Sequence, residues 1–312
     1  MQTRNFINSL DLSPSQYDRL FDLADRINQA PAAYAQQCQG KVMASLFYEP
    51  STRTRLSFEA AMLRLGGQIL TVADPKTSSA AKGESLADTI RTIAGYADLV
   101  VMRHPREGAA RLAGEFSPVP LINGGDGARE HPTQTLTDLF TIRTFLGRLQ
   151  GLSVGLCGDL RYGRTVHSLI RALARLGDQR FVLISPDELR LPSRVLEDAD
   201  KIGDNNTFDQ TRSMDDALAR CDVLYITRIQ KERFFNEEDY IALRDTYVLT
   251  AEKMKLAKPE MIVMHPLPRV TEIDADVDND ERAVYFEQAR LGMIARMALI
   301  LDLLKGGDDA AG

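Results

Sequence analysis

Short apolar runs rich in β-branched residues alternate along this chain with segments that have the periodicity of amphipathic helices. The runs cover residues 42–48, 68–72, 99–102, 119–122, 154–157, 181–184, 223–226 and 261–264. Between them, apolar residues recur at helical spacing, as at Phe58, Met62 and Leu65. Short apolar strands separated by helices are typical of parallel sheets that are covered on both faces. We therefore expect an α/β fold with two doubly wound domains, in which helices flank parallel sheets.

The length of 312 residues supports two domains, because a domain takes roughly 150 residues. We expect the first domain to span 1–134 and the second 135–288. An apolar helix over 289–304 is expected to pack back on the first domain.

Composition excludes several classes of protein. The formal net charge of −6 argues against a nucleic-acid binder, which usually carries a basic surface. The sequence shows no apolar signal segment and no apolar run of about 18 residues, so we expect no membrane association. Three cysteines without a CxxC pair are typical of reduced thiols in a cytoplasmic protein. No metal-site spacing such as HExxH occurs, and we expect neither a metal ion nor a cofactor.

Polar segments, most of them rich in arginine or histidine, follow the predicted strands in both halves. These segments are 49–55, 103–105, 131–134, 158–164, 227–230 and 265–269. In open α/β sheets, ligands bind at the carboxyl ends of the strands. We therefore expect the active site in the cleft between the two domains, lined by arginines.

The segment 51–55, Ser-Thr-Arg-Thr-Arg, predicts an anion site at the start of a helix. Ser51 suits the N-cap position, and the first helical turn offers unpaired N–H donors and a positive dipole end. Arg53 and Arg55 add charged, fork-shaped donors. The alternative is an ordinary capped helix with surface arginines. Neither a Walker A loop nor a GxGxxG dinucleotide motif is present.

Three motifs, in this order and at these separations, resemble those of the carbamoyltransferases. They are Ser-Thr-Arg-Thr-Arg at 51–55, His-Pro-Thr-Gln at 131–134 and His-Pro-Leu-Pro-Arg at 265–269. The resemblance runs from about Leu10 to about Leu304. Ornithine enzymes typically carry Ser-Met-Gly and His-Cys-Leu-Pro motifs, which this chain lacks. Lys82, Arg228 and Gln230 instead match the aspartate carbamoyltransferase branch, whose dicarboxylate substrate needs cations.

The resemblance implies transfer of the carbamoyl group of carbamoyl phosphate to the amino group of L-aspartate, in pyrimidine biosynthesis. The first domain would bind carbamoyl phosphate and the second aspartate. Thr54, Arg103 and His131 would contact the carbonyl oxygen as catalytic residues. The remaining contacts to carbamoyl phosphate would come from Ser51, Thr52, Arg53, Gln134, Pro266 and Leu267. The resemblance also implies a cis bond between Leu267 and Pro268.

By the same resemblance, aspartate would bind second, through two groups of residues that are mostly cations. Arg103 and Arg164 would hold its α-carboxylate, with Leu267 close by, and Arg228, Gln230 and Lys82 would hold its β-carboxylate. The loop with Ser78 and Lys82 would reach a neighbouring subunit's site, which implies a homotrimer. A regulatory chain or a dihydroorotase as a further partner is left open. Glu49, Arg233 and either Glu238 or Asp239 are candidates for closure salt bridges.

Two other functions are kept open at this point: a carbamoyltransferase for another amine such as ornithine, and a non-catalytic anion-binding relative. Three histidines, His104, His131 and His265, precede prolines and are candidates for turn residues as well as for the site. For His167, on a predicted helix face, we expect a structural role.

Overall fold

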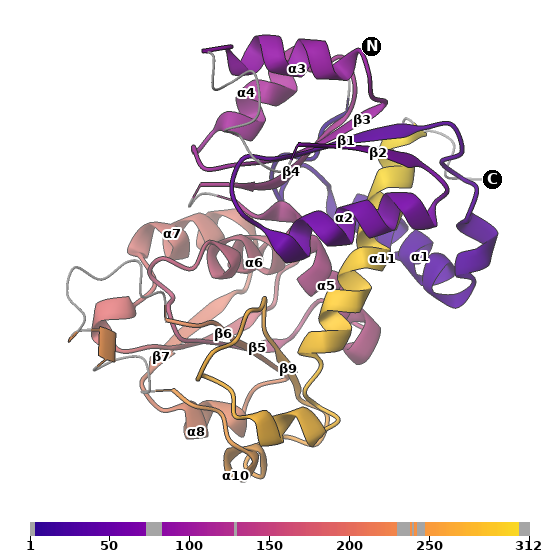
Figure 1. Ribbon diagram of the computed structural model, residues 1–312. Coiled ribbons are helices and arrows are strands. Elements are labelled where there is room, and N and C mark those ends of the chain that lie inside the picture. Colours follow the sequence, from indigo (N-terminus) through magenta and orange to yellow (C-terminus); the bar gives the residue numbers. More distant parts are fainter. Residues whose placement is uncertain are drawn as a thin grey trace. The chain divides into compact units, whose positions relative to one another are not determined.

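The computed structural model describes residues 4–72, 83–127, 130–229, 238, 240–241 and 247–305 (Figure 1). The chain divides into two compact units. Unit 1 consists of Met1–Thr137 and Leu291–Gly312, and unit 2 of Asp138–Arg290.

Unit 1 is built on a parallel sheet with the strand order β2-β1-β3-β4. Its strands are β1 (Val42–Phe47), β2 (Gln68–Val72), β3 (Leu99–His104) and β4 (Leu121–Asp126). Its helices are α1 (Pro14–Gln29), α2 (Thr52–Arg64), α3 (Leu86–Ala94) and α4 (Ala109–Phe116), with the first turns of α5 (Pro132–Leu146) and most of α11 (Tyr285–Leu304). A short 3-10 helix, Pro31–Tyr34, follows α1.

The alternation of side chains along β1 explains why helices cover both faces of this sheet. Ala44 and Leu46 pack with residues of α3 and α4 in one core cluster. Ser45 points to the other face, where its hydroxyl donates to Glu59 of α2 at 3.0 Å. Both faces of β1 are therefore buried, which fits a strand that reads as a continuous apolar run.

Unit 2 is built on a second parallel sheet, with the order β7-β6-β5-β8-β9. Its strands are β5 (Ser153–Cys157), β6 (Arg180–Ile184), β7 (Thr207–Thr211), β8 (Val223–Ile226) and β9 (Ile262–Met264). Its helices include α5 after Thr137, α6 (Arg164–Ala174), α7 (Ser193–Ile202), α8 (Met214–Leu218) and α10 (Ala251–Met254). The 3-10 helices Asp187–Leu189 and Ala275–Asn279 lie in its connections.

The two sheets confirm the predicted α/β class and its parallel strands, but two predictions about strands were wrong. The prediction missed β7, an edge strand in which Phe208 is the only large apolar residue. It also ended the strand of residues 119–122 at Ile122, whereas β4 continues through the glycine-rich segment that follows, to Asp126. There the residues are fully buried, and the small glycines leave room for side chains of the neighbouring strand.

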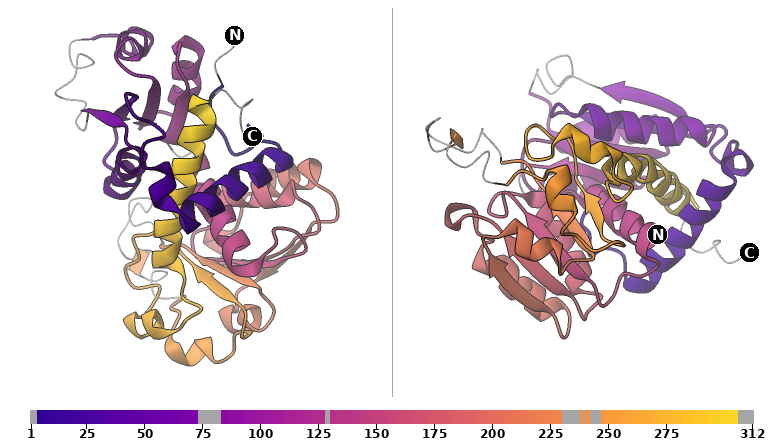
Figure 2. Two further views of the ribbon diagram at one scale, coloured as in Figure 1. Left: turned by 90° about the vertical axis from the view of Figure 1, so that its right-hand side faces the viewer. Right: turned by 90° about the horizontal axis from the view of Figure 1, so that it is seen from below.

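Helix α11 contributes to unit 1 through a buried arginine. The Arg296 guanidinium donates to the Ser57 hydroxyl of α2 at 2.9 Å and stacks over the Phe58 ring at 5.1 Å. In Figure 1, α11, drawn in yellow, runs beside α2, which agrees with these contacts (Figures 1 and 2). Among the helices that the structure describes, α11 included, none meets the length and apolarity needed to cross a membrane.

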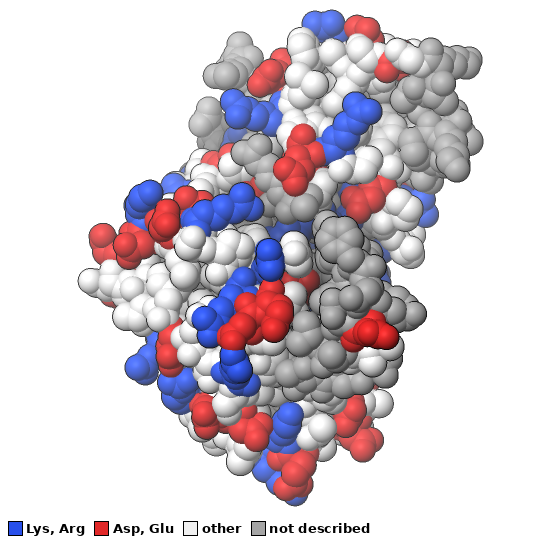
Figure 3. All heavy atoms as spheres, turned by 90° about the vertical axis from the view of Figure 1, so that its left-hand side faces the viewer, with Lys and Arg blue, Asp and Glu red and all other residues white. Residues whose placement is uncertain are grey.

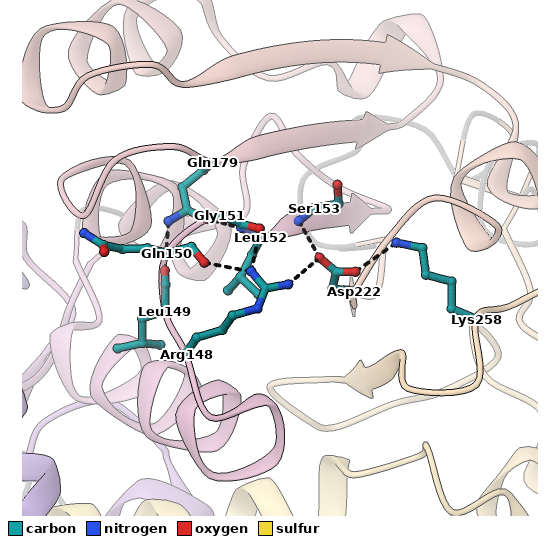
Figure 4. Close-up of polar contacts among 9 residues, drawn as sticks. All are labelled: Arg148, Leu149, Gln150, Gly151, Leu152, Ser153, Gln179, Asp222 and Lys258. Atoms are coloured by element: carbon teal, nitrogen blue, oxygen red, sulfur yellow. Dashed lines mark hydrogen bonds and ion pairs between the residues drawn. The ribbon is translucent and has the colours of Figure 1, made fainter.

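The amino ends of β5 and β8 are joined by a set of polar contacts (Figure 4). Asp222 accepts from the Ser153 amide at 2.9 Å, from Lys258 Nζ at 2.9 Å and from Arg148 Nη2 at 3.3 Å. Gln179 donates to the Leu149 carbonyl at 2.8 Å. These contacts satisfy the backbone where the chain enters the sheet.

Candidate active site

In unit 1 the residues predicted to bind an anion lie at the start of α2, directly after β1. Ser51 occupies the N-cap position as predicted, but its side chain makes no capping hydrogen bond. Its ψ of 90° differs from the 162° of Ser13, a capping residue whose hydroxyl accepts from Gln16 N. Thr52 and Arg53 are exposed, whereas Thr54 is buried. The first turn of α2 therefore presents backbone N–H groups together with hydroxyl and guanidinium donors, a combination suited to a phosphate.

Arg103, the next predicted residue, lies at the carboxyl end of β3, beside β1. It pairs in register with Phe47, and its carbonyl accepts from Tyr48 N at 2.9 Å. Its guanidinium is buried and held from several sides: Nε contacts Glu49 at 3.2 Å and Nη1 contacts the Gly124 carbonyl at 3.5 Å. A buried guanidinium held in this way keeps a fixed direction before any ligand binds.

His131 and Gln134 follow β4 at the same edge of the sheet. His131 is buried, and its Nε2 lies 3.3 Å from Arg103 Nη1. Gln134 is half-buried in the first turn of α5, and its N–H donates to the His131 carbonyl at 2.9 Å. Gly125 lets the backbone of β4 come close to the Arg103 guanidinium, because a Cβ at this position would lie only 3.2 Å from Nη1. Its φ of 122° also disfavours residues other than glycine.

His104 and His167 have structural partners. The His104 Nδ1 accepts from Arg106 N at 3.0 Å, which is a turn contact, and burial lowers the pKa of its imidazole. The His167 Nε2 lies 2.8 Å from the Leu160 carbonyl, and burial likewise lowers the pKa of this ring. Both rings are therefore expected to stay neutral near pH 7.

In unit 2 the predicted arginines lie at the carboxyl edge of the sheet. Arg164 is the first residue of α6, after β5, and Arg228 follows β8; both are half-buried. The connection after β5 runs close to β8: a Cβ on Gly158 would lie 2.2 Å from the Thr227 carbonyl oxygen. Only glycine fits there, so Gly158 sets the backbone immediately before Arg228.

The loop after β9 carries Pro266 and Leu267. The peptide bond between Leu267 and Pro268 is cis, which confirms the prediction. Leu267 also has a φ of 54°, in the left-handed region that leucine rarely adopts. Such a conformation costs about 1–3 kcal/mol and persists only where its surroundings hold it.

Those surroundings are a buried pair that the sequence analysis did not identify. His265 Nδ1 accepts from Leu267 N at 2.8 Å, and its Nε2 lies 2.8 Å from Glu272 Oε1. His265 was a candidate site residue, but Glu272 was missed, since an acidic residue seven positions after a histidine carries no recognisable signal. Burial alone raises the pKa of the Glu272 carboxyl, but its hydrogen bonds with His265 and backbone amides outweigh burial and lower that pKa.

Several predicted site residues fall outside the described residues. They are Ser78, Lys82, Gln230, Arg233 and Asp239. Among the candidates for closure salt bridges, Glu49 pairs with Arg103 at 3.2 Å, a pair that was not predicted.

On the face shown in Figure 3, acidic and basic side chains lie interspersed. At the carboxyl edge of the second sheet, acidic residues also pair with arginines and so offset part of their charge. Asp187, after β6, pairs with Arg190 at 2.6 Å and also contacts Arg212.

Comparisons with known proteins cover the whole of this arrangement. Residues 4–144 match the model of the aspartate/ornithine carbamoyltransferase carbamoyl-P binding domain, and residues 150–303 match that of the Asp/Orn binding domain. An aspartate carbamoyltransferase catalytic subunit from Clostridium botulinum is 53% identical, over 97% of this chain and 99% of that relative.

Two solved structures are similar in fold and sequence. The catalytic subunit of M. jannaschii aspartate transcarbamoylase superposes with a TM-score of 0.91 at 47% identity, covering 98% of this chain and 100% of that chain. The Trypanosoma cruzi aspartate transcarbamoylase in complex with N-(phosphonacetyl)-L-aspartic acid gives a TM-score of 0.89 at 41% identity, covering 96% of each chain.

Proposed function

The chain belongs to the aspartate/ornithine carbamoyltransferase family, and from this premise we propose that it transfers the carbamoyl group of carbamoyl phosphate to L-aspartate. The products are N-carbamoyl-L-aspartate and phosphate, an early step of pyrimidine biosynthesis. The observation that carries the proposal is the buried contact between Arg103 and His131, one strand away from the anion-binding start of α2.

Carbamoyl phosphate binds through two sets of groups in this proposal. Its phosphate is held by Ser51, Thr52, Arg53 and Thr54 at the start of α2. Its carbonyl oxygen faces Thr54, Arg103 and His131, and its amino group donates to Gln134 and to the carbonyl oxygens of Pro266 and Leu267. The fixed guanidinium of Arg103 supports this assignment, because donors aimed at a developing oxyanion act best when they need no rearrangement.

We assign aspartate as the second substrate because its two carboxylates need cations, and this chain supplies cations for both. Arg164 and Arg103 bind the α-carboxylate, with Leu267 close by, and Arg228, Gln230 and Lys82 bind the β-carboxylate. Half-burial of Arg164 and Arg228 supports these roles, since a partly desolvated guanidinium binds a carboxylate more strongly than an exposed one does.

The reaction forms a C–N bond and breaks a C–O bond without a covalent enzyme intermediate. The neutral aspartate amine attacks the carbamoyl carbon, and the tetrahedral intermediate places negative charge on the former carbonyl oxygen. Collapse expels phosphate, which takes the proton that the amine loses. The protein supplies orientation and stabilisation of charge, and Arg103 with His131 is the centre of that stabilisation.

The chain acts as a cytoplasmic homotrimer in this proposal, with the loop of Ser78 and Lys82 reaching a neighbouring subunit's site. Helix α2 supports a subunit contact in unit 1, because Leu56 and Leu63, seven positions apart on one helical face, are 52% and 60% exposed. The mass of the purified chain, measured by light scattering, distinguishes a trimer from a monomer or a larger assembly. Whether a regulatory chain or a dihydroorotase joins the trimer is a separate question. A monomer with full activity would contradict shared sites.

The reaction is tested by supplying the purified chain with carbamoyl phosphate and measuring ureido product with aspartate and with ornithine in parallel. Product with aspartate alone is the expected result. Product with ornithine alone would overturn the choice of second substrate. No product with either amine, despite phosphate-analogue binding, would favour a non-catalytic anion-binding relative.

The carboxylate clamp is tested at the two ends of β8. Arg228→Gln is expected to raise the KM for aspartate by about 10–100-fold, the effect of a lost charge-assisted hydrogen bond, and to leave the KM for carbamoyl phosphate unchanged. Arg220→Gln makes the same change of charge at the amino end of the strand, where Arg220 pairs with Asp209 at 2.7 Å. Equal effects of the two variants would exclude a direct role of Arg228.

A further inference from the structure

We infer that His265 and Glu272 are positioning residues that fix the backbone of Leu267, and thereby the direction of the carbonyl groups that face the carbamoyl amino group. This inference rests on the proposed function, in which the Pro266 and Leu267 carbonyl oxygens accept from that amino group. Neither side chain touches a substrate in this account, because both act through the loop after β9.

The partners of His265 determine which of its nitrogens carries the proton. A backbone amide can only donate, so the 2.8 Å contact from Leu267 N requires a lone pair on His265 Nδ1. The proton of the neutral imidazole is then on Nε2, where it donates to Glu272 Oε1 at 2.8 Å. Glu272 therefore selects the tautomer that can hold Leu267.

Glu272 is itself held by the far side of the same loop. Its Oε2 accepts from Val270 N at 3.1 Å and from Thr271 N at 3.0 Å. The Glu272 carboxylate thus links the end of the loop, at Val270 and Thr271, to His265 at the start of the loop. His265 in turn binds the middle of the loop at Leu267. Both residues are buried, at 2% and 5% exposure, so water does not compete for these bonds.

A second layer of hydrogen bonds anchors His265 to the helices. The His265 N–H donates to Gln288 Oε1 at 2.9 Å, and Gln288 Nε2 donates to Asp138 Oδ1 at 2.7 Å. Asp138 also accepts from the Tyr225 hydroxyl at 3.0 Å. The backbone of His265 is therefore fixed independently of its ring. The ring itself accepts the hydrogen bond from Leu267 N and so fixes the Leu267 backbone.

The unusual backbone of Leu267 shows why the loop needs such control. A φ of 54° is unfavourable for leucine, and the residue would relax towards negative φ if its N–H lost its partner. Relaxation would turn the adjoining carbonyl groups by a large angle, and a reacting group misplaced by about 1 Å can lose about 100-fold in rate.

The test is a matched pair of substitutions of His265. In His265→Asn, the amide oxygen lies where Nδ1 was and still accepts from Leu267 N. In His265→Gln, the amide nitrogen reaches the place of Nε2 and still donates to Glu272. Both variants remove the ring and one hydrogen bond, so a purely structural role predicts equal losses of activity that follow the losses in Tm.

The positioning role predicts unequal losses. We expect His265→Asn to keep most of its kcat/KM for carbamoyl phosphate, and His265→Gln to lose about 100-fold at a similar Tm. Equal kinetic losses in the two variants would overturn the inference while leaving the proposed function intact. Absence of turnover in the unmodified chain would instead overturn the proposed function.

A nearly isosteric change tests the pair if either histidine variant fails to fold. Glu272→Gln puts an amide NH2 against either His265 Nε2–H or the amides of Val270 and Thr271, so one donor always faces another. We expect a loss of about tenfold in kcat/KM, that of one ordinary hydrogen bond. The exposed Glu281→Gln is the matched control and should keep the rate of the unmodified chain. A Glu272→Gln variant with that same rate would overturn the inference.

A spectroscopic readout is independent of activity. Nitrogen-15 NMR of the histidine side chains distinguishes the two neutral tautomers, and the His265 resonance is assigned by its loss in His265→Asn. The inference requires the proton on Nε2. A proton on Nδ1 would overturn it, because that nitrogen could not then accept from Leu267 N.

Discussion

Arg103 Nη1 lies 3.3 Å from His131 Nε2, and both side chains are more than nine-tenths buried. A guanidinium has donors only, so Nε2 of the neutral ring accepts and the ring proton is on Nδ1. Because Nε2 accepts from Arg103, His131 orients the guanidinium and is poorly placed to act as a general base through that nitrogen. This relationship favours a role in stabilising the oxyanion.

The first prediction concerns His131→Ala. We expect kcat to fall by about 100–1,000-fold, the effect of losing one oxyanion-stabilising group, while the affinity for a phosphate analogue stays nearly unchanged. Steady-state kinetics and titration calorimetry measure the two quantities. The control is His104→Asn, which keeps an acceptor for Arg106 N. A large loss of analogue affinity in His131→Ala would show that His131 helps to form the phosphate site instead.

The second prediction separates two effects of adding a methyl group to glycine. Gly158 and Gly147 both have positive φ, 111° and 68°, but only at Gly158 would a Cβ meet the Thr227 carbonyl oxygen, at 2.2 Å. Gly147→Ala should lower the free energy of unfolding by about 1–2 kcal/mol, which is the cost of the left-handed backbone. Gly158→Ala should cost more and should also raise the KM for aspartate, because Thr227 precedes Arg228. An unchanged KM in a folded Gly158→Ala would show that Arg228 is insensitive to this contact.

Much of this site was predictable because its residues follow strands. Apolar runs locate β1 and β3 in the first sheet and β8 and β9 in the second, and within each parallel sheet the carboxyl ends of the strands share one edge. Arg103, Arg228 and His265 therefore had to lie at such edges. Periodicity alone supplies this information, without any knowledge of side-chain packing.

Other features depend on tertiary contacts and could not be predicted. Strand β7 is a mostly polar edge strand, recognisable only by its pairing with β6. By sequence alone, the buried glycines of β4 are typical of a turn. Only the structure shows that Gly125 lies in a strand beside the Arg103 side chain. Glu272 and Gln288 become meaningful only once the backbone brings them to His265. In each case a long-range contact overrides the local pattern.

The third prediction concerns the acid stability contributed by Asp222. Burial alone raises the pKa of this carboxyl, but hydrogen bonds from Lys258 and Ser153 N, with the charge of Arg148, outweigh burial and hold that pKa below its usual value. A lowered folded-state pKa gives stability that is present above the unfolded value of about 3.9 and is lost as the pH falls through the folded value.

Asp222→Asn should therefore lower the free energy of unfolding by about 2 kcal/mol at pH 7, with the difference shrinking below about pH 4. Urea unfolding at several pH values measures the effect. Asp198→Asn is the control, because Asp198 pairs with Arg171 at 3.0 Å but is 47% exposed, and such a pair contributes about 1 kcal/mol or less. Equal losses in both variants at pH 7 would contradict a special contribution from Asp222.

The fourth prediction concerns the three thiols, all of which are buried. Burial raises the pKa of Cys38 and of Cys221 to about 11, and raises that of Cys157 further. At pH 8, about one thiol in a thousand is then ionised at Cys38 or Cys221, and burial also blocks access of a reagent. A disulfide reagent such as DTNB should therefore titrate almost no thiol in the native chain and three per chain in guanidinium chloride. Rapid reaction of one thiol per native chain with DTNB would show that a cysteine becomes exposed through local opening. The labelled peptide would then identify the segment that opens.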